Sequence, residues 1–445
     1  MRAPITGVTV TDAADATSLT DLIRNEEFLA LASTAFARSQ AYSTILIALA
    51  MYADLFGTSG TVEGLFGTVF ALTQFLIVLP LGRVVDTGNS KRYLLAGLLL
   101  NIAIFTGFTF VTAVEHVLVL RALQGVGASL LWITGSTVVG EISPDGKRGL
   151  WLGSYNQVAA VSSLAGTIFG GLLLYTYGFQ TTYAVLVAVT TLATLSVYRF
   201  LRDNPGQQTD TADASGLDTL KTLLQRPAIR ALVSFRFGFS VAKMAVVIFL
   251  PIYAKTQFGI NPLAIGGILA GGKLTKSLLQ GRMGTLIDGA EHRYKFVFAG
   301  AAVYAVGILF IPLAGSATQF LSAVSLSAAG RTMVLPPAFF GLFAAYGVLG
   351  VGDSIRLPAS MTLFVEEGER LDAVAGSFSL RSLSWKVGQL IGPVAVGAIW
   401  EATSALVAFW VAAGCAGAAA VAFVAMAIRS TRREQRASTA VRSAD

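Results

Sequence analysis

Twelve long apolar stretches constrain this chain more than any other feature of its sequence. Each is close to the roughly 20 residues that a helix needs to cross the hydrocarbon core of a bilayer. Lipid also requires every backbone group to be bonded within its own helix. We therefore predict an all-α membrane protein with twelve transmembrane helices, at about 33–56, 61–83, 93–113, 117–140, 150–174, 179–200, 231–254, 263–284, 295–315, 338–364, 373–397 and 403–427.

The basic residues between these stretches predict an orientation, because Lys and Arg are enriched in cytoplasmic loops. With the N-terminus inside, the outer loops hold only Lys255 and Arg331. We expect a multi-pass cell-membrane protein with both termini cytoplasmic. This topology accounts for the net charge of +7, so no nucleic-acid partner is predicted. The inner segments carry Arg83, Lys91, Arg92, Lys147, Arg148, Arg202, Lys221, Arg226, Arg282, Arg293, Lys295, Arg370, Arg429, Arg432 and Arg433.

An internal repeat predicts how the helices are grouped. "LGRVVD" at 81–86 is echoed by "MGTLID" at 283–288, and "GVGAS" at 125–129 by "GVGDS" at 350–354. Six helices repeated in the same order predict two pseudo-symmetric six-helix bundles, related by an axis normal to the membrane. The change in spacing places an insertion of about two dozen residues near 316–337, outside the membrane. We expect an N-terminal segment 1–32, bundles 33–200 and 231–427, a linker 201–230 and a tail 428–445.

The linker and the tails are polar. Residues 202–218 are rich in Asp, Thr and Gln and contain Pro and Gly, which favours a solvated connection. The following "TLKTLLQRPAIRAL" predicts a short helix at the membrane interface. Residues 1–17 and 434–445 are expected to be disordered.

The charged stretch "GRVVDTGNSKR", 82–92, forms the predicted cytoplasmic turn between the second and third helices. Gly82 would let another helix approach, and Asp86 could face the positive end of a neighbouring helix. The same pattern returns at Gly284 and Asp288. We expect Asp86 and Glu141, with Arg92 or a neighbouring base, to close one half, and Asp288 and Glu366 to close the other. The alternative is a basic loop that only sets topology.

These residues resemble the major facilitator superfamily of secondary transporters over nearly the whole chain. The loop residues match its pattern between helices 2 and 3, and "RALQGVGAS", 121–129, is similar to its helix-4 motif with a buried Arg. "GTIFGG", 166–171, is similar to its helix-5 antiporter motif, with Thr167 replacing Pro. The resemblance, to the drug:proton antiporter-like branch, implies alternating access, a small-molecule substrate, a coupling proton and conformational roles for Gly82, Asp86, Lys91, Arg92, Gly166, Gly170, Gly171, Gly392 and Pro393.

Ionisable groups inside membrane helices are expensive and mark functional sites. Here the cations outnumber the one acid placed deep in a helix, Asp353, which is also the candidate for proton coupling. This excess predicts an anionic substrate or an anionic group on a larger one. Snorkelling to the interface or contact with lipid headgroups is the alternative. The candidate substrate-binding residues are Tyr42, Arg121, Arg236, Lys243, Lys273, Lys276, Arg356, Arg381 and Lys386.

The cost of placing a cation in lipid favours a shared, water-filled location for four of these substrate-binding candidates. A cation facing lipid at mid-membrane costs at least about 2.5–3.5 kcal/mol on insertion scales. We therefore expect Arg121, Lys243, Lys273 and Arg356 to converge on a water-filled central cavity, with Asp353 salt-linked there. The acids Asp54 and Glu63 flank the turn between the first two helices, where we expect them to be solvated.

Two functions stay open: proton-coupled efflux of drug-like or organic solutes by antiport, and organic-anion transport through a cationic cavity. An enzyme is not expected, because the chain has no Gly-x-Ser-x-Gly elbow and no nucleotide-binding loop. His116 and His292 are its only histidines and Cys415 its only cysteine, so no metal site or cofactor is predicted. A monomer in the lipid bilayer is expected.

Overall fold

The computed structural model describes residues 22–442 except 23, 145–146, 204–216, 329–330 and 372. Nearly all of the described chain is helical. Asn and Gly residues set several helix ends. The side chain of Asn25 accepts the backbone N–H of Phe28 at 2.8 Å, and Gly57 ends the first long helix at a φ of 55°. Such N-caps and left-handed C-caps satisfy the free backbone groups of helix termini.

In the described part of the chain, five long helices precede the linker, and the last of them is broken. Gly178 has a φ of 74° inside it, a left-handed conformation that suits glycine and separates two helices. The predicted division into 150–174 and 179–200 is therefore found at this residue. The helices are α2 (Glu26–Phe56), α3 (Gly60–Thr87), α4 (Ser90–Phe108), α5 (Val114–Ile142) and α6 (Arg148–Phe200).

The second group of helices follows a short helix, α7 (Leu217–Gln225), which buries Leu223. Residue types again set the boundaries: α8 and α9 each start with Pro in the first turn, where its missing N–H costs nothing. The long helices here are α8 (Pro227–Phe258), α9 (Pro262–Asp288), α10 (Arg293–Phe310), α11 (Pro337–Glu369), α12 (Val374–Ala402) and α13 (Ala405–Arg442).

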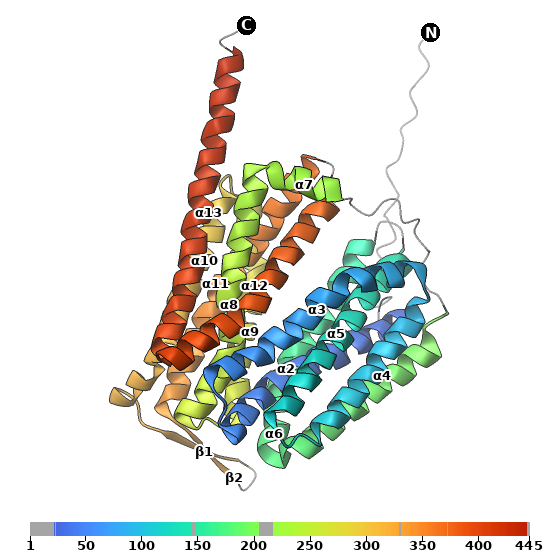
Figure 1. The fold of residues 1–445 in the computed structure, drawn as a ribbon, viewed down its shortest axis with the longest axis vertical. Helices are drawn as coiled ribbons and strands as arrows, with labels where there is room; N and C mark the ends of the chain where they lie inside the picture. Colours follow the sequence, from blue (N-terminus) through green and yellow to red (C-terminus); the bar gives the residue numbers. More distant parts are fainter. Residues whose placement is uncertain are drawn as a thin grey trace, which may run out of the picture.

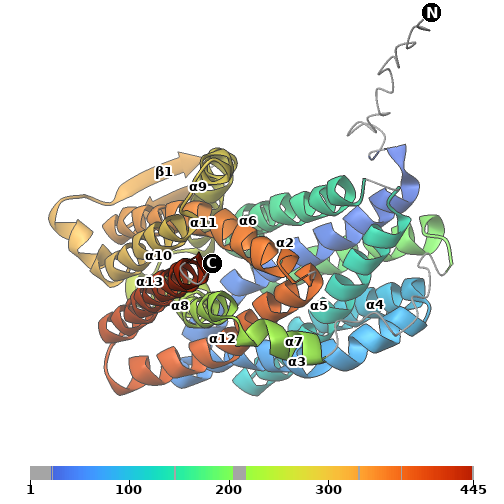
Figure 2. The same ribbon diagram turned by 90° about the horizontal axis from the view of Figure 1, so that it is seen from above.

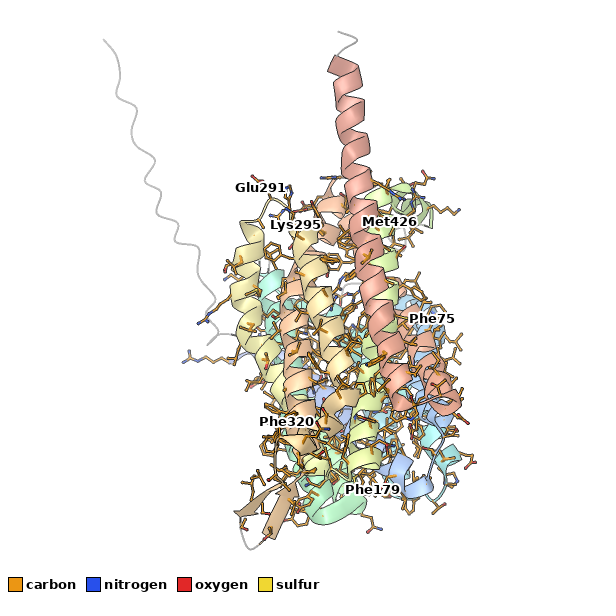
Figure 3. The ribbon with its side chains drawn as sticks, turned by 90° about the vertical axis from the view of Figure 1, so that its left-hand side faces the viewer. Phe75, Phe179, Glu291, Lys295, Phe320 and Met426 are labelled. Atoms are coloured by element: carbon orange, nitrogen blue, oxygen red, sulfur yellow. The ribbon has the colours of Figure 1, made fainter. Side chains whose placement is uncertain are left out.

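The helices before the linker and those after it form two groups that lie side by side (Figures 1 and 2). The end of the molecule that carries α7 and the last turns of α13 is called the linker end. Glu291 and Lys295, at the turn between α9 and α10, lie there, whereas Phe179 and Phe320 lie at the other, hairpin end (Figure 3). The sequence prediction places the linker end in the cytoplasm.

The insertion near 316–337 contains a β-hairpin. A 3₁₀ helix, η1 (Pro312–Gln319), leads into β1 (Val324–Ala328) and β2 (Arg331–Leu335), which pair antiparallel with Val324 opposite Leu335. The predicted ninth helix, 295–315, was too long: α10 ends at Phe310, and the tighter η1 begins at Pro312. A proline removes a backbone donor and favours such a change of helix type.

The predicted disorder of 434–445 is wrong for residues 434–442, which continue α13 in helical form. The segment has no Pro or Gly and is rich in Arg, Glu, Gln and Ala, all of which support a helix. The other expected disordered segment, 1–17, lies outside the described residues.

Among the described residues, eight helical segments are long and apolar enough to cross a membrane by length and composition alone. One of them, Leu150–Phe200, holds the two helices that meet at Gly178. Large apolar side chains such as Leu76 and Leu192 are exposed, as lipid contact requires. α2, α9 and α12 are not among the eight, and all three place polar or charged side chains in the interior.

The two groups pack tightly against each other toward the hairpin end. A Cβ added at Gly64 on α3 would lie 2.5 Å from the carbonyl oxygen of Pro393 on α12. A Cβ at Gly266 on α9 would lie 2.2 Å from the carbonyl oxygen of Thr167 on α6. The α3–α12 contact, called the α3–α12 seam below, and the α6–α9 contact therefore depend on glycine for the close approach of backbones.

Filling the α3–α12 seam should open the hairpin end. Gly64→Leu is expected to disfavour the packed arrangement by about 1–3 kcal/mol, the usual cost of overpacking, or roughly 5- to 150-fold in the equilibrium. Thiol-accessibility labelling of cysteines placed at the hairpin end of α3 would detect it. Gly153→Leu is the control, because nothing lies within 4 Å of an added Cβ there. Equal labelling in both variants would contradict a tight seam.

Candidate substrate site

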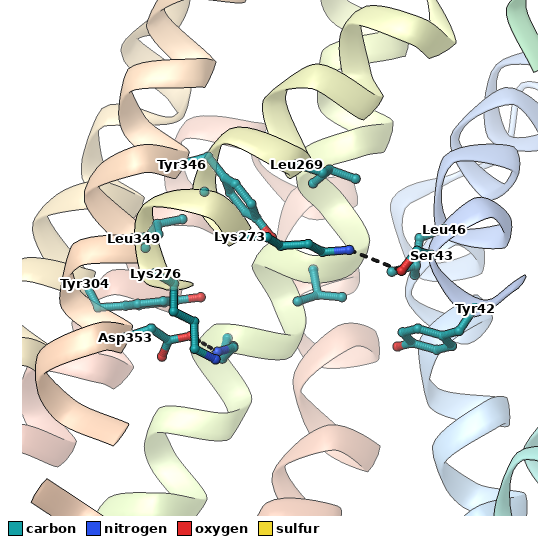
Figure 4. A pocket seen from close by; sticks show the side chains of 14 residues that line it. Tyr42, Ser43, Leu46, Leu269, Lys273, Lys276, Tyr304, Tyr346, Leu349 and Asp353 are labelled. Atoms are coloured by element: carbon teal, nitrogen blue, oxygen red, sulfur yellow. Dashed lines mark hydrogen bonds and ion pairs between the residues drawn. The ribbon is translucent and has the colours of Figure 1, made fainter. Parts of the chain in front are cut away.

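A cavity of about 220 Å³ lies between the two groups of helices. The first group lines it with α2 only, whereas the second group supplies α8, α9, α10 and α11 (Figure 4). Its walls combine apolar, aromatic, hydroxyl and charged side chains. They are Tyr42, Ser43, Leu46, Lys243, Val247, Leu269, Gly272, Lys273, Lys276, Tyr304, Tyr346, Leu349, Gly350 and Asp353.

Asp353, one turn from Arg356 on α11, holds two cations. Its Oδ2 forms an ion pair with Lys243 of α8, and its Oδ1 lies 2.7 Å from an Arg356 amino nitrogen. Asp353 is 5% exposed and Arg356 is 1% exposed. The guanidinium of Arg356 lies 3.9 Å from the ring centre of Phe239. Both carboxylate oxygens are thus engaged, and the three groups together carry one positive charge.

Lys273 on α9 reaches across to the first group of helices. Its ammonium donates to Ser43 Oγ on α2 at 3.1 Å and to the carbonyl and hydroxyl oxygens of Ser163 on α6, both at 2.9 Å. The expected convergence of Lys243 and Lys273 on one cavity is therefore observed. Because all three acceptors are neutral, the charge of Lys273 is not cancelled by its partners.

Lys276, one turn further along α9, lines the same cavity. Its side chain extends toward Asp353 in Figure 4, but it forms no ion pair or hydrogen bond with any residue that the structure describes. Lys243, Lys273 and Lys276 therefore surround one cavity, and the single carboxylate on its wall already holds two cations. The site attracts a negative charge that the protein itself does not supply.

Hydroxyl and aromatic groups complete the lining, and no distinct sequence signal marks them. Tyr304 and Tyr346 line the wall near Asp353, and the ammonium of Lys243 lies 5.7 Å from the Tyr304 ring centre. Ser43 and Ser163 hold Lys273. Ser and Tyr are frequent in membrane helices, so only the three-dimensional arrangement distinguishes these four residues.

Arg121 does not line the cavity, which corrects the expected position. It is fully buried between α5 and α3, where its Nε donates to the carbonyl oxygen of Phe66 at 2.8 Å and one amino group donates to Gln124. Its guanidinium lies 4.3 Å from the Phe70 ring centre, and that ring lies 5.5 Å from Tyr42 on the cavity wall. One aromatic ring therefore separates this cation from the cavity.

Arg356 likewise lies behind the wall, since Asp353 stands between it and the cavity. The remaining cations are nearer the linker end. Arg236 donates to the carbonyl oxygen of Arg381 at 2.8 Å and stacks on Trp385 at 4.8 Å. Lys386 on α12 bonds to Gln74 on α3, across the two groups. Arg236, Arg381 and Lys386 do not line the cavity.

The charges repeated in the two turns, 82–92 and 284–293, have different surroundings. The contacts of Gly82 and of the Asp86 side chain lie outside what the structure describes, so the gate prediction for Asp86 stays a prediction. Nearby, Lys91 lies 3.4 Å from Asp203, and the Asn89 side chain accepts the backbone N–H of Arg92. Glu141 also takes part in an interaction, and its role in a gate stays a prediction.

In the second turn Glu366 forms an ion pair with Arg293. Arg293 also donates to the carbonyl oxygens of Ile287 at 3.2 Å and Asp288 at 3.0 Å. The carboxylate of Asp288 is exposed, and its backbone carbonyl rather than its side chain contacts Arg293, so its role in a gate stays a prediction. A Cβ at Gly284 would meet nothing within 4 Å, and no close helix contact exists there.

The glycines of the helix-5 and helix-11 patterns do lie at close contacts. Added Cβ atoms at Gly166 and Gly170 would press on Gln40 and Thr44 of α2, 2.3 Å and 2.2 Å away. A Cβ added at Gly171 would lie 2.6 Å from the Pro262 carbonyl oxygen at the start of α9. A Cβ added at Gly392 would lie 2.6 Å from the Val241 carbonyl oxygen of α8, and the following Pro393 packs on Gly64.

Two bundles of membrane helices around a polar cavity define a multi-pass membrane transporter. The Major Facilitator Superfamily model matches residues 31–340, and the chain belongs to that family of secondary transporters. It is 23% identical to an uncharacterized MFS-type transporter of Methanocaldococcus jannaschii over 78% of this chain and 84% of that one. It is 24% identical to Multidrug resistance protein MdtG of Dickeya zeae, over 81% and 84% of the two chains.

Solved structures give the same fold. A bacterial homologue of the human lysosomal transporter Spinster, in an inward-facing and unoccupied conformation, aligns with a TM-score of 0.69 and 14% identity. The alignment covers 92% of this chain and 96% of that one. The predicted all-α fold of two six-helix bundles and the predicted family are confirmed, and both family and fold are those of transporters rather than enzymes.

Proposed function

We propose that this major facilitator protein carries a small organic anion across the cell membrane. The observation that carries the proposal is the charge of the cavity: three lysines line it, and its one carboxylate is already paired with Lys243 and Arg356. Lys276 is the cation that remains for a ligand. Charge-assisted hydrogen bonds from such ammonium groups are the strong ones in carboxylate and phosphate recognition.

The rest of the lining favours an amphipathic solute. Leu46, Val247, Leu269 and Leu349 supply apolar surface, and tyrosine rings stand on opposite walls. Binding sites for small molecules combine such a surface with a few well-placed polar groups. An organic acid with an apolar or aromatic body fits this combination better than an inorganic anion does.

Movement of the two bundles would carry the ligand across. The bundles pack closely at the hairpin end, through the α3–α12 and α6–α9 contacts. Lys273 bridges them at the cavity itself, through Ser43 and Ser163. With the linker end in the cytoplasm, as the basic loops predict, these contacts close the outer side of the protein. Similarity to a transporter in an inward-facing conformation supports such an arrangement.

Efflux of drug-like compounds by proton antiport is the second candidate. It is supported by the similarity to Multidrug resistance protein MdtG over most of the chain and by the closely packed Gly166 and Gly170 of the helix-5 pattern. Asp353 is the candidate proton acceptor for that function in the cavity. Its two existing cation partners favour the anion function instead, since a cationic drug would compete with both.

A matched set of ligands separates the two functions. Purified protein in proteoliposomes would be offered radiolabelled aromatic and aliphatic carboxylates, their neutral amides and amines of the same shape, with and without a pH gradient. We expect uptake or exchange of acids and little transport of the amides. Transport of the amines alone, driven by the gradient, would contradict the anion function and support drug efflux.

A further inference from the structure

A second charged group of the interior lies far from the cavity, at the hairpin end. Glu63, in the first turn of α3, is 5% exposed, although its sequence position next to a turn predicts solvation. It forms no ion pair with any described residue. Its nearest polar partner is the hydroxyl of Thr58, at 3.5 Å from Oε1, a long and weak contact.

No basic side chain in the described part of the chain pairs with Glu63 to compensate its charge. The N-terminus of α3 would favour an anion, because its free N–H groups carry a partial positive charge. That position is taken: Glu401 of α12 accepts the backbone N–H of Thr61 through Oε2 at 3.1 Å. Glu401 is itself exposed to solvent. It is the charged group that faces Glu63 across the α3–α12 seam, and it repels a second negative charge there.

Glu63 is also next to a tightly packed part of the seam. A Cβ at the adjacent Gly64 would lie 2.5 Å from Pro393, and one at Gly67 would lie 2.8 Å from Ile248 of α8. Alternating access requires α3 and α12 to separate here. Burial of Glu63 is therefore a property of the closed hairpin end, and opening the seam would bring water to its carboxyl group.

We propose that Glu63 is a proton-binding site that couples protonation to closure of the hairpin end. A buried carboxylate without a counter-ion costs several kcal/mol, whereas the neutral acid does not. Closure therefore takes a proton from water onto a Glu63 oxygen, and opening returns it to water on the hairpin side. Because the closed state holds more protons than the open one, acid stabilises the closed state.

The inference depends on the alternating-access part of the proposed function and is independent of the substrate. By linkage, one proton bound only in the closed state shifts the open-to-closed ratio by up to about tenfold per pH unit. The substrate cavity keeps its own charges, Lys243 and Asp353 among them, so ligand recognition and this coupling act at separate places.

The experiment measures the distance between spin labels at the hairpin end, in reconstituted protein without substrate. Cysteines at Phe110 and Ser404, both in exposed positions on different bundles, would be labelled in a Cys415→Ala background. As the pH falls from about 8 to about 5, the wild type should shift to the short-distance population, by up to about tenfold per unit. Glu63→Gln, which copies the neutral acid, should stay in that population throughout, and Glu63→Asp should keep a pH response.

Glu115→Gln is the matched control, since Glu115 is an exposed acid at the hairpin end of α5, and it should respond as the wild type does. A pH response that persists in Glu63→Gln, or a Glu63→Gln population that is open, would overturn the assignment. So would a wild type whose distances do not change with pH. None of these results bears on whether the cavity accepts anions, which the transport assay decides separately.

Discussion

Lys276→Gln is expected to weaken binding of an anionic substrate by roughly 10- to 150-fold, with little loss of protein stability. The change removes one charged hydrogen-bond donor, and such bonds contribute about 1.5–3 kcal/mol. Stability should hold because Lys276 forms no ion pair or hydrogen bond with the described part of the chain. Titration calorimetry with the acids that proteoliposomes transport, together with a thermal unfolding scan, measures both quantities.

Lys386→Gln is the matched control for this prediction. Lys386 is an interior lysine as well, but it bonds to Gln74 and does not line the cavity. Its replacement should leave affinity for the acid within about threefold, a change of less than 1 kcal/mol. Equal losses of affinity in the two variants would show that general positive charge, rather than a ligand contact at Lys276, draws the anion.

Asp353→Ala should destabilise the protein more than any other single loss of an acid in the described chain. It leaves Lys243 and the fully buried Arg356 without their shared counter-ion. Removing one partner of a buried ion pair costs about 3–5 kcal/mol. The midpoint of thermal unfolding in detergent should fall accordingly, whereas Asp288→Ala, at an exposed acid, should change stability by about 0.5 kcal/mol or less.

Combining Asp353→Leu with Lys243→Met and Arg356→Met should recover part of the lost stability. Replacement of a whole buried group of charges by apolar side chains is often neutral, because every desolvation cost disappears. Recovery would identify the buried charge as the cause of the loss. A triple variant as unstable as Asp353→Ala would instead assign the loss to packing around α11.

The sequence predicted the helices well because lipid imposes a simple rule on length and apolarity. It also predicted the interruption near residue 178, where glycine adopts a positive φ. The ends were harder. The early end of α10 depends on Pro312 and the 3₁₀ turn that follows it. The continuation of α13 depends on helix propensity in a polar segment whose composition also favours disorder. For the β-hairpin, the sequence showed only a change in the spacing between the repeated motifs of the two halves.

The site residues that could be predicted are ionisable residues inside apolar helices, because this was the only clear sequence signal for them. Lys243, Lys273 and Lys276 stand out as charges inside apolar helices, and the structure brings them to one cavity. The same signal selected Arg121, but it could not tell a cavity wall from the far side of Phe70. Glu63 was missed because its burial depends on α12, which follows it by more than 300 residues. Such distant packing leaves no local trace in sequence.

The central claim is that the cavity holds an anion through positive charge at Lys276. Charge can be removed and restored there chemically, since Cys415 is the only cysteine of the chain. In a Cys415→Ala background, Lys276→Cys should transport organic acids poorly. Reaction with aminoethyl methanethiosulfonate then places an ammonium group at the same position, and the sulfonatoethyl reagent places a negative charge there.

Transport of a radiolabelled organic acid by these modified proteins in proteoliposomes is the most direct measurement. We predict recovery after the aminoethyl reagent and no recovery, or a further loss, after the sulfonatoethyl reagent. Free acid during labelling should slow the reaction, because it occupies the space beside the thiol. Recovery with either reagent alike, or wild-type transport by the unmodified Lys276→Cys protein, would contradict an anion site at Lys276.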